Sequence, residues 1–509
     1  MTTAALRPAL ALLASLAFLP AASADEPAKC TYVEVATLPI RYAGSDLVPA
    51  TDGVIDGSPA TMLIDTGSDQ TFLTRTAVEK RDLSLHMTGR YVEGVSGLSR
   101  IYATRLKEFA VGPARSARRL ELQVVGQTTY TPSYDAIVGA EFLFQADLEL
   151  SLRDKELKFF RPQDCGQAWL GYWKEDSIAV PFESSFSRSR NPHFTVMLNG
   201  KKLDAMIDSG AQHTVVMLGA AKRAGIEPGG AGTTRLADMA GVGTDRAPHW
   251  SAVYDTLAIG TETIRGGEIG VVDSQGSSPA DIYLGQDFLR AHRVLFAMSQ
   301  QKLYLAYLGG DVFRQRKGIE PWMQAEADAG NPDAQYLLAE MYQRGRGVAQ
   351  DKVQAAMWLE KAAALGQPQA GLLVGRRLML VGLPIEGAAR IKAALDKLPA
   401  ERYGALWLHV ARLRNGEPDS ARRELEATFK RGDSDDWPGP IAEFYLGRID
   451  AARLLAQAGK DQRAAKARSC QANTYMAELR GAQGDKEQAA SLVATVRANC
   501  GPPPASTAR

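Results

Sequence analysis

The sequence predicts a multidomain protein whose first half is all-β and duplicated and whose second half is an all-α repeat array. Two acidic residues, Asp65 and Asp208, each follow an apolar run and precede a hydroxyl residue and a glycine. Strand-type patterns continue to Tyr307, after which Ala and Leu recur at helical spacing. A chain of 509 residues is also too long for a single hydrophobic core.

The first 24 residues are expected to be a secretory signal peptide that lies outside the mature fold. They contain one Arg, an apolar stretch from Ala9 to Leu19 and the small-residue triplet Ala22-Ser23-Ala24. No later segment is long and apolar enough to predict a transmembrane anchor. We therefore expect an exported protein, in a bacterial periplasm or secreted, whose mature chain begins near Asp25.

Composition excludes several classes of partner and chemistry. Lys plus Arg is 59 against 58 for Asp plus Glu, so the charge predicts no nucleic-acid partner. The 6 His are scattered without metal-ligand spacing, and no glycine-rich phosphate loop occurs. We expect neither a metal nor another cofactor. An apolar share of 45% indicates a folded chain.

A hairpin signal precedes each of the two acids. Asp56-Gly57 lies nine residues before Asp65, and Asn199-Gly200 lies nine residues before Asp208. Asp-Gly and Asn-Gly between apolar runs favour two-residue turns, because both turn positions need positive φ. Each acid is therefore expected at the end of the second strand of a hairpin.

Further landmarks recur in the same order after each acid, which indicates duplication of a β-rich unit of about 130 residues. The corresponding pairs are Gly139 with Gly285, Phe142-Leu143 with Phe288-Leu289, the Asp154-Lys155 turn with Gln300-Gln301, and glycine-containing segments 91–100 with 238–248.

Each unit resembles a lobe of a retropepsin-like aspartic peptidase. The resemblance is carried by Asp65-Thr66-Gly67 and Asp208-Ser209-Gly210, followed by Ile137-Val138-Gly139 and Tyr283-Leu284-Gly285. It covers roughly residues 31–310 and implies an all-β, double-lobed acid-protease fold, with lobes at 25–165 and 170–310. It also implies an aspartic endopeptidase acting on peptide or protein substrates.

The resemblance implies that Asp65 and Asp208 form the catalytic pair. Two carboxylates at one site hold a single proton, because like charges at close range raise one pKa. One acid can then activate a water while the other donates to the substrate carbonyl. Thr66 and Ser209 are expected to cross-link the two turns. Gly67 and Gly210 should let backbone amides approach the acids.

The position after each motif differs between the copies, with Ser68 in the first and Ala211 in the second. A hydroxyl at position 68 is expected to hydrogen-bond Asp65 and to make the two acids inequivalent.

Two glycine-containing segments fall at the position of the family's flaps. They consist of Gly94, Val95, Ser96 and Gly97 in the first unit and Gly241, Val242 and Gly243 in the second. The resemblance implies mobile tips that close over an extended peptide bound by strand addition, although simple hairpin turns are the alternative. Asp69 and Gln212 are expected to cap the peptide backbone.

Residues 316–502 are expected to form the helical repeat domain. Residues 327–370 resemble a Sel1-like repeat, with the Gly345-Arg346-Gly347-Val348 loop, Trp358 and Lys361-Ala362-Ala363. The remaining stretch resembles helical hairpins of the tetratricopeptide (TPR) kind. Such arrays either bind a protein partner or stabilise their neighbours, and the sequence leaves both roles open.

The 4 cysteines predict two disulfides in an oxidising compartment. Cys470 begins one predicted helix and Cys500 ends its antiparallel partner, so a helical hairpin would bring them together. Cys30, before the first strand, would then pair with Cys165, after the last hairpin of the first unit.

Two other functions compete with peptide hydrolysis. The lobes could bind peptides without turning them over, or the helical repeats could be the functional part as an interaction scaffold. Retention of both acids and both following glycines favours the enzyme.

Overall fold

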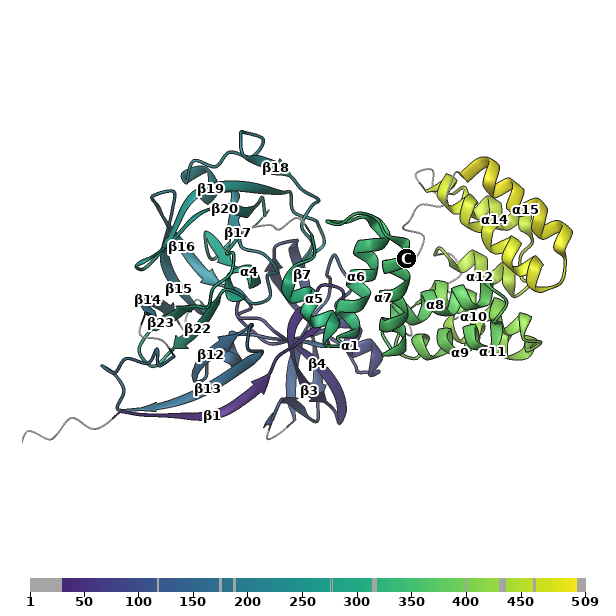
Figure 1. Ribbon diagram of the computed structural model, residues 1–509. Coiled ribbons are helices and arrows are strands. Elements are labelled where there is room, and N and C mark those ends of the chain that lie inside the picture. Colours follow the sequence, from purple (N-terminus) through teal and green to yellow (C-terminus); the bar gives the residue numbers. More distant parts are fainter. Residues whose placement is uncertain are drawn as a thin grey trace, which may run out of the picture.

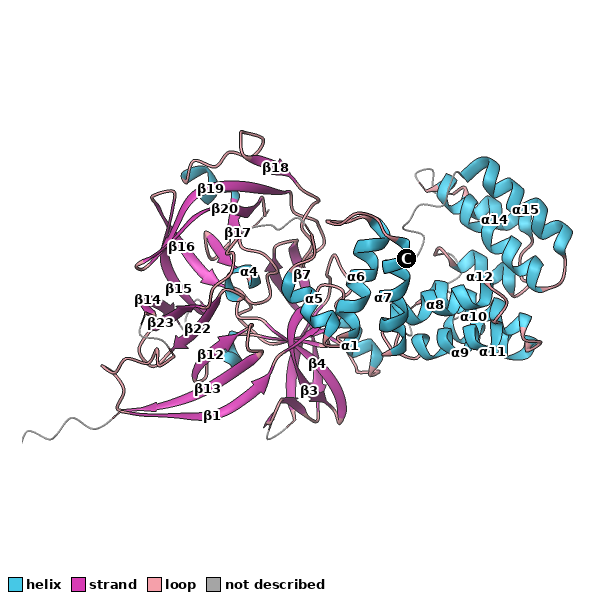
Figure 2. Ribbon diagram, in the orientation of Figure 1, coloured by secondary structure: helices cyan, strands magenta, loops and turns pink. Residues whose placement is uncertain are grey.

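The computed structural model describes residues 30–116, 119–173, 176–185, 189–274, 276, 278–313, 318–398, 401–429, 436–460 and 464–500. The expected signal peptide, residues 1–24, lies outside this part. Strands form the first half of the described chain and helices the second (Figures 1 and 2). The predicted fold class, an all-β double-lobed protein followed by an all-α array, is confirmed.

The two lobes share one antiparallel sheet at their base. Its strands, in spatial order, are β1 (Thr31–Pro39), β13 (Glu156–Gln163), β12 (Asp147–Ser151), β22 (His292–Ala297), β23 (Lys302–Tyr307) and β14 (Ile178–Ser185). At its centre β12 pairs with β22, with Leu148 opposite Phe296 and Leu150 opposite Val294. The outer half of each hairpin pairs with the strand that opens the same lobe. The shared sheet therefore relates the lobes by an approximate twofold axis.

The upper part of the first lobe is a second sheet. Its strands are β2 (Arg41–Ala43), β3 (Val48–Ile55), β4 (Ser58–Ile64), β5 (Phe72–Thr74), β6 (His86–Gly94), β7 (Gly97–Leu106), β8 (Phe109–Val111), β9 (Ala114–Arg115), β10 (Leu120–Val125) and β11 (Ala136–Val138). Asp56 and Gly57 form the two-residue turn between β3 and β4, with φ of 47° and 77°. The predicted hairpin before Asp65 is thus confirmed.

The second lobe has equivalent strands, but they continue the shared sheet, because β14 pairs with β15. Its strands are β15 (Ser189–Leu198), β16 (Lys201–Ile207), β17 (Val215–Met217), β18 (Thr233–Arg235), β19 (His249–Ile259), β20 (Glu262–Val272) and β21 (Ile282–Leu284). Asn199 and Gly200 turn with φ of 47° and 75° between β15 and β16. The hairpin predicted before Asp208 is therefore also present.

Short helices occupy equivalent places in the two lobes. They are α1 (Arg75–Lys80) and α2 (Ala140–Leu143) in the first, and α3 (Leu218–Arg223) and α4 (Gln286–Leu289) in the second. Gly139 precedes α2 and Gly285 precedes α4. A Cβ at Gly139 would lie 2.3 Å from the Gln70 carbonyl oxygen, and one at Gly285 would lie 2.6 Å from the His213 carbonyl carbon. Both positions therefore exclude a side chain.

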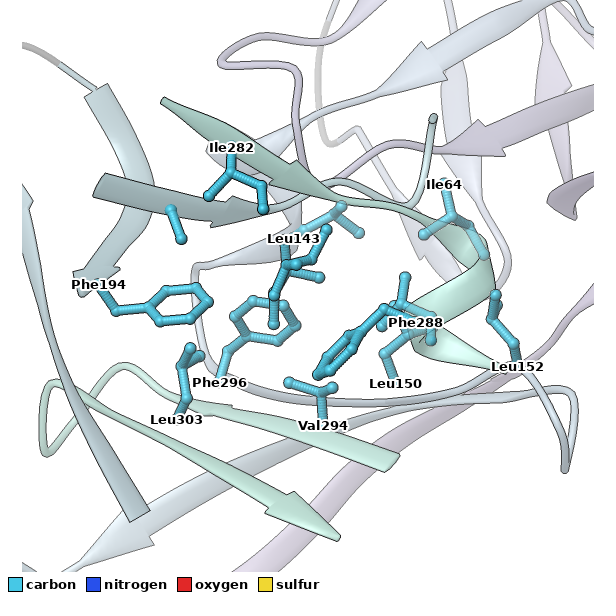
Figure 3. Close-up of a cluster of buried hydrophobic side chains, with 14 of the residues drawn as sticks. Ile64, Leu143, Leu150, Leu152, Phe194, Ile282, Phe288, Val294, Phe296 and Leu303 are labelled. Carbon is cyan, nitrogen blue, oxygen red and sulfur yellow. The ribbon is translucent and has the colours of Figure 1, made fainter. Parts of the chain in front are cut away.

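One hydrophobic core runs through both lobes. Ile64, Leu143 and Leu150 of the first lobe belong to the same buried cluster as Phe288 and Phe296 of the second (Figure 3). All five side chains are less than 2% exposed. Separating the lobes would expose this apolar surface to water, so the two halves fold as one unit.

The second half consists of helices that pack as successive hairpins. They are α5 (Pro321–Asp328), α6 (Pro332–Arg344), α7 (Lys352–Ala364), α8 (Pro368–Leu380), α9 (Pro384–Leu395), α10 (Arg402–Arg414), α11 (Pro418–Thr428), α12 (Gly439–Tyr445), α13 (Ala451–Ala458), α14 (Ala465–Ala482) and α15 (Lys486–Cys500). Helix α6 begins at the Asn331 cap and ends at Gly345, whose φ of 66° is left-handed. No helix in the described part of the chain is long and apolar enough to cross a membrane.

Both predicted disulfides are present. Cys30 is bonded to Cys165, which joins the start of β1 to the segment after β13. Cys470 of α14 is bonded to Cys500 of α15. Each disulfide closes one structural unit at its ends.

The first helices of the array pack directly on the first lobe. Tyr42 and Leu47, from β2 and the turn that follows it, are buried in one cluster with Leu338 and Trp358. Nearby, the Gly44 backbone N–H donates to Asp333 Oδ2 at 2.7 Å. This interface favours the stabilising role that the sequence left open.

We predict that Leu47→Ala lowers the free energy of unfolding of the full chain by about 2–5 kcal/mol, because Leu47 is completely buried. In a chain ending at residue 313, the lobes should unfold at lower temperature, and the same substitution should have little further effect. Thermal unfolding of the four proteins measures both changes. Equal stability of the long and short chains would show that the helices do not support the lobes.

Candidate functional site

Asp65 and Asp208 lie on two equivalent turns that meet between the lobes. Asp65 follows β4 and Asp208 follows β16. Asp65 Oδ1 accepts hydrogen bonds from the backbone N–H groups of Gly67 and Ser68, both at 3.0 Å. Asp208 Oδ1 accepts from Gly210 at 2.8 Å and from Ala211 at 3.1 Å. Each turn thus fixes its own carboxylate in the same orientation.

The motif glycines bring each carboxylate against the opposite turn. A Cβ at Gly67 would lie 2.4 Å from Asp208 Cγ, and one at Gly210 would lie 2.6 Å from Asp65 Cγ. Only glycine leaves room for the opposing acid at these positions. The two carboxyl groups therefore meet across the approximate twofold axis.

Thr66 and Ser209 exchange hydrogen bonds between the turns. The Thr66 backbone N–H donates to Ser209 Oγ, and the Ser209 backbone N–H donates to Thr66 Oγ1, both at 3.0 Å. The Thr66 hydroxyl donates to the Ile207 carbonyl at 2.8 Å, and the Ser209 hydroxyl donates to the Ile64 carbonyl at 2.7 Å. Every polar atom of both hydroxyls is used across the interface.

The expectation that the Ser68 hydroxyl binds Asp65 is wrong. Ser68 Oγ donates to the Gln70 carbonyl at 2.9 Å instead. Only the Ser68 backbone N–H reaches Asp65, as that of Ala211 reaches Asp208. Because the local turn directs the hydroxyl away from the acid, the Ser–Ala difference does not distinguish the two carboxylates.

Burial raises the pKa of both acids. For Asp65 the pKa is raised well above its usual value by burial first and then by the charge of Asp208, against the lowering effect of the Ser68 and Gly67 amides. Burial likewise raises the pKa of Asp208, while the Gly210 and Ala211 amides oppose it. Two acids in this arrangement hold one proton over a broad pH range.

The two expected flaps differ in form but contact each other. The first is the tip of the β6–β7 hairpin, where Gly94 pairs with Gly97. The second is a loop between β18 and β19 in which Met239 bridges to Ala247, while Val242 and Gly243 bridge to Thr128 and Ser96 of the first lobe. The Ser96 backbone N–H donates to the Val242 carbonyl at 3.1 Å.

Each flap tip places a valine in the apolar cluster of the opposite lobe. Val242 packs with the first-lobe cluster that includes Phe72 and Tyr134. Val95 packs with the second-lobe cluster that includes Val215 and Tyr283. The flaps are therefore closed on one another in this structure.

The expected peptide-capping residues are placed differently from each other. Asp69 is exposed beside the first turn. Gln212 is also exposed, but its Nε2 donates to the Asp46 carbonyl of the first lobe at 3.0 Å. The amide of Gln212 is therefore engaged by the chain itself.

Four further side chains belong to the site and were missed in the sequence. Tyr130 and Tyr134 belong to the apolar cluster against which Val242 packs, and burial raises the pKa of both phenols, with the charge of Asp65 adding to each shift. Asn191 Nδ2 donates to the Thr66 carbonyl at 2.5 Å, and Gln286 Nε2 donates to the Ser209 carbonyl at 3.0 Å. Only Gln286 had a signal, since it directly follows the landmark Gly285.

The donor set does not suggest a metal. Within the described residues, no group of three or more His, Cys, Asp and Glu side chains could hold a metal ion. The carboxylates instead face one another and backbone amides.

Comparison with protein families matches two regions in the first half of the chain and one region in the second. Residues 51–142 and 194–288 match the aspartyl protease family model. Residues 332–367, which contain α6 and α7, match the Sel1 repeat. The chain thus carries two aspartyl protease lobes in tandem followed by Sel1-type helices, and the resemblance seen in the sequence is confirmed.

Two solved structures illustrate the similarity. An aspartic proteinase from Irpex lacteus is 14% identical, with 54% of this chain and 97% of that chain covered and a TM-score of 0.34. Basic 7S globulin from soybean is 12% identical, with 56% and 100% covered and a TM-score of 0.32.

A curated relative is similar over a shorter stretch. An exopolysaccharide production negative regulator from Rhizobium leguminosarum bv. viciae is 36% identical over 89 residues, which is 18% of this chain. The match spans 33% of that relative's length.

We predict that Asp65→Asn stabilises the protein at neutral pH. Because the folded-state pKa is raised, the native pair contributes less stability as pH rises from about 3.9 through that pKa. Asn removes this cost and can still accept from Gly67 and Ser68. The free energy of unfolding should rise at pH 7 and be unchanged near pH 3.

Chemical unfolding across this pH range measures the effect, with the exposed Asp255→Asn as control. A destabilised Asp65→Asn protein at pH 7 would show that the carboxylate is not under strain.

Proposed function

We propose that this protein is an exported aspartic endopeptidase. The observation that carries the proposal is the meeting of Asp65 and Asp208 on amide-lined turns, with each motif glycine packed against the opposite carboxyl group. This arrangement yields one shared proton in a partly exposed position, which is what general acid–base hydrolysis of an amide requires.

In the proposed reaction the ionised carboxylate takes a proton from a water molecule as the water oxygen attacks the scissile carbonyl carbon. The protonated carboxyl donates a hydrogen bond to the former carbonyl oxygen, which carries the negative charge in the resulting tetrahedral intermediate. When the C–N bond breaks, the amine nitrogen takes up a proton from the pair. In each turnover the dyad takes one proton from water and gives one to the amine, so it ends with the single proton it started with. Because water is the nucleophile, no covalent adduct with the enzyme forms, and no cofactor is needed.

The substrate we propose is an extended peptide that enters beneath the flaps. Because Val95 and Val242 fill the apolar clusters of the opposite lobes, the flaps have to separate before a peptide can bind. Residue side chains of the peptide would then replace the two valines, while its backbone pairs with the flap edges. In this proposal Asp69, which is exposed, accepts a hydrogen bond from a peptide N–H.

Export is supported by two features of different kinds. The described chain pairs all its cysteines as disulfides, which persist in oxidising compartments. The first residues have the pattern of a signal peptide. We propose that the mature protein acts in the periplasm or outside the cell.

The Sel1-type helices would offer a surface for a protein partner away from the lobes. The described helices beyond α7 turn further outward from the β lobes (Figure 1). Peptide binding without turnover is the alternative function, and it is separated from hydrolysis by the following experiment.

We predict that Asp65→Asn and Asp208→Asn each abolish cleavage of an unfolded polypeptide, because an amide can neither take up nor return the proton. The double substitution should be little worse than either single one, since the acids act as one unit. The intact protein should show a bell-shaped pH profile. Assays from pH 3 to 8 test these results.

A peptide containing a statine-type transition-state mimic should inhibit the intact protein, and the matched control Asp255→Asn should cleave normally. Peptide binding by a protein that cleaves nothing would support the binding alternative. Near-normal cleavage by Asp208→Asn would mean that the second lobe is not catalytic.

We also predict that locking the flaps together blocks cleavage reversibly. A Cβ at Gly241 would lie 3.6 Å from Val95 Cβ, within the range for a disulfide. Val95→Cys combined with Gly241→Cys should be inactive when oxidised and should regain cleavage of a short peptide on mild reduction. Val95→Cys alone and the reduced double variant are the controls, because a Cβ at Gly241 would lie 2.2 Å from Cγ1 of an unchanged Val95. Full activity of the cross-linked protein would disprove flap opening.

A further inference from the structure

Gln286 and Arg290 distinguish the second lobe from the first at equivalent positions. Gly139 corresponds to Gly285, so Gln286 replaces Ala140 and Arg290 replaces Phe144. Phe144 packs inside the lobes against Phe296, with ring centroids 5.0 Å apart. The Gln–Arg pair therefore breaks the internal symmetry on the side that faces the helical domain.

Gln286 joins the Asp208 turn to Arg290. Its side chain is completely buried, and its Nε2 donates to the Ser209 carbonyl at 3.0 Å. Its Oε1 accepts from Arg290 Nη2 at 2.9 Å. Both ends of the Gln286 amide are thus hydrogen-bonded. The position of Arg290 is therefore coupled through this side chain to the position of the Ser209 carbonyl.

The turn of Asp65 also has a backbone carbonyl that accepts a hydrogen bond from an amide side chain, but that side chain lies on a different element. The Thr66 carbonyl, equivalent to that of Ser209, receives Asn191 Nδ2 at 2.5 Å from β15. Both carbonyls beside the acids therefore have an amide side-chain donor. The donor of the second turn, Gln286, is connected through Arg290 to Trp322 of the helical domain.

Arg290 is held by aromatic rings of two other units. Its guanidinium carbon lies 3.7 Å from the ring centroid of Trp322 in α5 and 5.7 Å from that of Tyr42 in β2. Trp322 and Tyr42 also pack on each other, with centroids 5.1 Å apart. Arg290 forms no ion pair within the described part of the chain, and its Nε has no hydrogen-bond partner there. Its position therefore depends on the two rings.

We propose that Trp322, acting through Arg290 and Gln286, positions the Ser209 carbonyl and with it Asp208. The inference rests on the proposed hydrolytic function and extends it by making the helical domain part of the machinery that orients the acids. Trp322, Arg290 and Gln286 are positioning residues, since none of them contacts the substrate-facing carboxylates in the structure. A partner that moves α5 would then change the turnover rate.

The test compares kcat and KM for a short peptide, which is too small to reach the helical domain. Trp322→Ala, Arg290→Met and Gln286→Leu should each lower kcat about 5- to 10-fold, as expected for one lost buried hydrogen bond. KM should stay within about twofold, because the flaps and apolar clusters are untouched. Trp322→Phe keeps an aromatic face and should restore most of the rate.

Trp358→Ala is the matched control for loss of helical stability. Trp358 is buried in the same cluster on α7 and stacks with Lys361, not with Arg290. The Trp358→Ala substitution should lower the melting temperature, while kcat stays normal at a temperature where this variant is folded. The Trp322→Ala, Gln286→Leu double variant should be no slower than the slower single variant, because the residues act in series.

Hydrogen exchange separates this inference from the proposed function. The Gly210 and Ala211 amides, which donate to Asp208, should exchange faster in Trp322→Ala than in the intact protein or Trp358→Ala. If the intact protein cleaves nothing but these amides respond, hydrolysis fails and the positioning inference stands. Additive rate losses, or equal effects of Trp358→Ala and Trp322→Ala, would overturn it.

Discussion

The paired hydrogen bonds between Thr66 and Ser209 are the constraint on which the site depends. Two buried acids repel each other, so something other than the acids has to hold their turns together. The two hydroxyls do this by accepting the opposite turn's backbone N–H and donating to the opposite strand's carbonyl. A buried, fully satisfied network of this kind fixes one geometry. The β12–β22 pairing beneath it supplies the apolar surface that stabilises the contact.

Each lobe also contacts the other at the flaps. Val95 and Val242 occupy apolar surface of the opposite lobe, and both side chains stay partly exposed. Backbone hydrogen bonds also join the flaps, from Ser96 to the Val242 carbonyl and from Asp245 to the Ser96 carbonyl. The proposed opening of the flaps would break these contacts, whereas the buried contacts of Thr66 and Ser209 that hold the acids would stay intact.

The sequence predicted features that local chemistry determines and missed those set by distant segments. Asp56-Gly57 and Asn199-Gly200 specify hairpins because both turn positions need positive φ. The Ser68 hydroxyl was misassigned because the turn directs it to Gln70, a choice that three-dimensional geometry makes. Asn191 lies in β15 and Tyr130 and Tyr134 precede β11, outside the two acid motifs, so no short pattern identifies them. The packing of Leu47 of the first lobe against the helical domain depends on contact between units, which residue spacing does not reveal.

Duplication gives two equivalent acids, but hydrolysis needs one of them to be the acid and the other the base. The immediate turns do not supply that difference, since both carboxylates accept two backbone amides in the same way. The neighbouring groups do differ. The turn of Asp208 is tied through Gln286 and Arg290 to Trp322 in the first helix of the array, whereas the amide that donates to the first turn is Asn191 of β15. The difference between Asp65 and Asp208 therefore comes from residues outside the duplicated motif, and the helical domain supplies some of these residues.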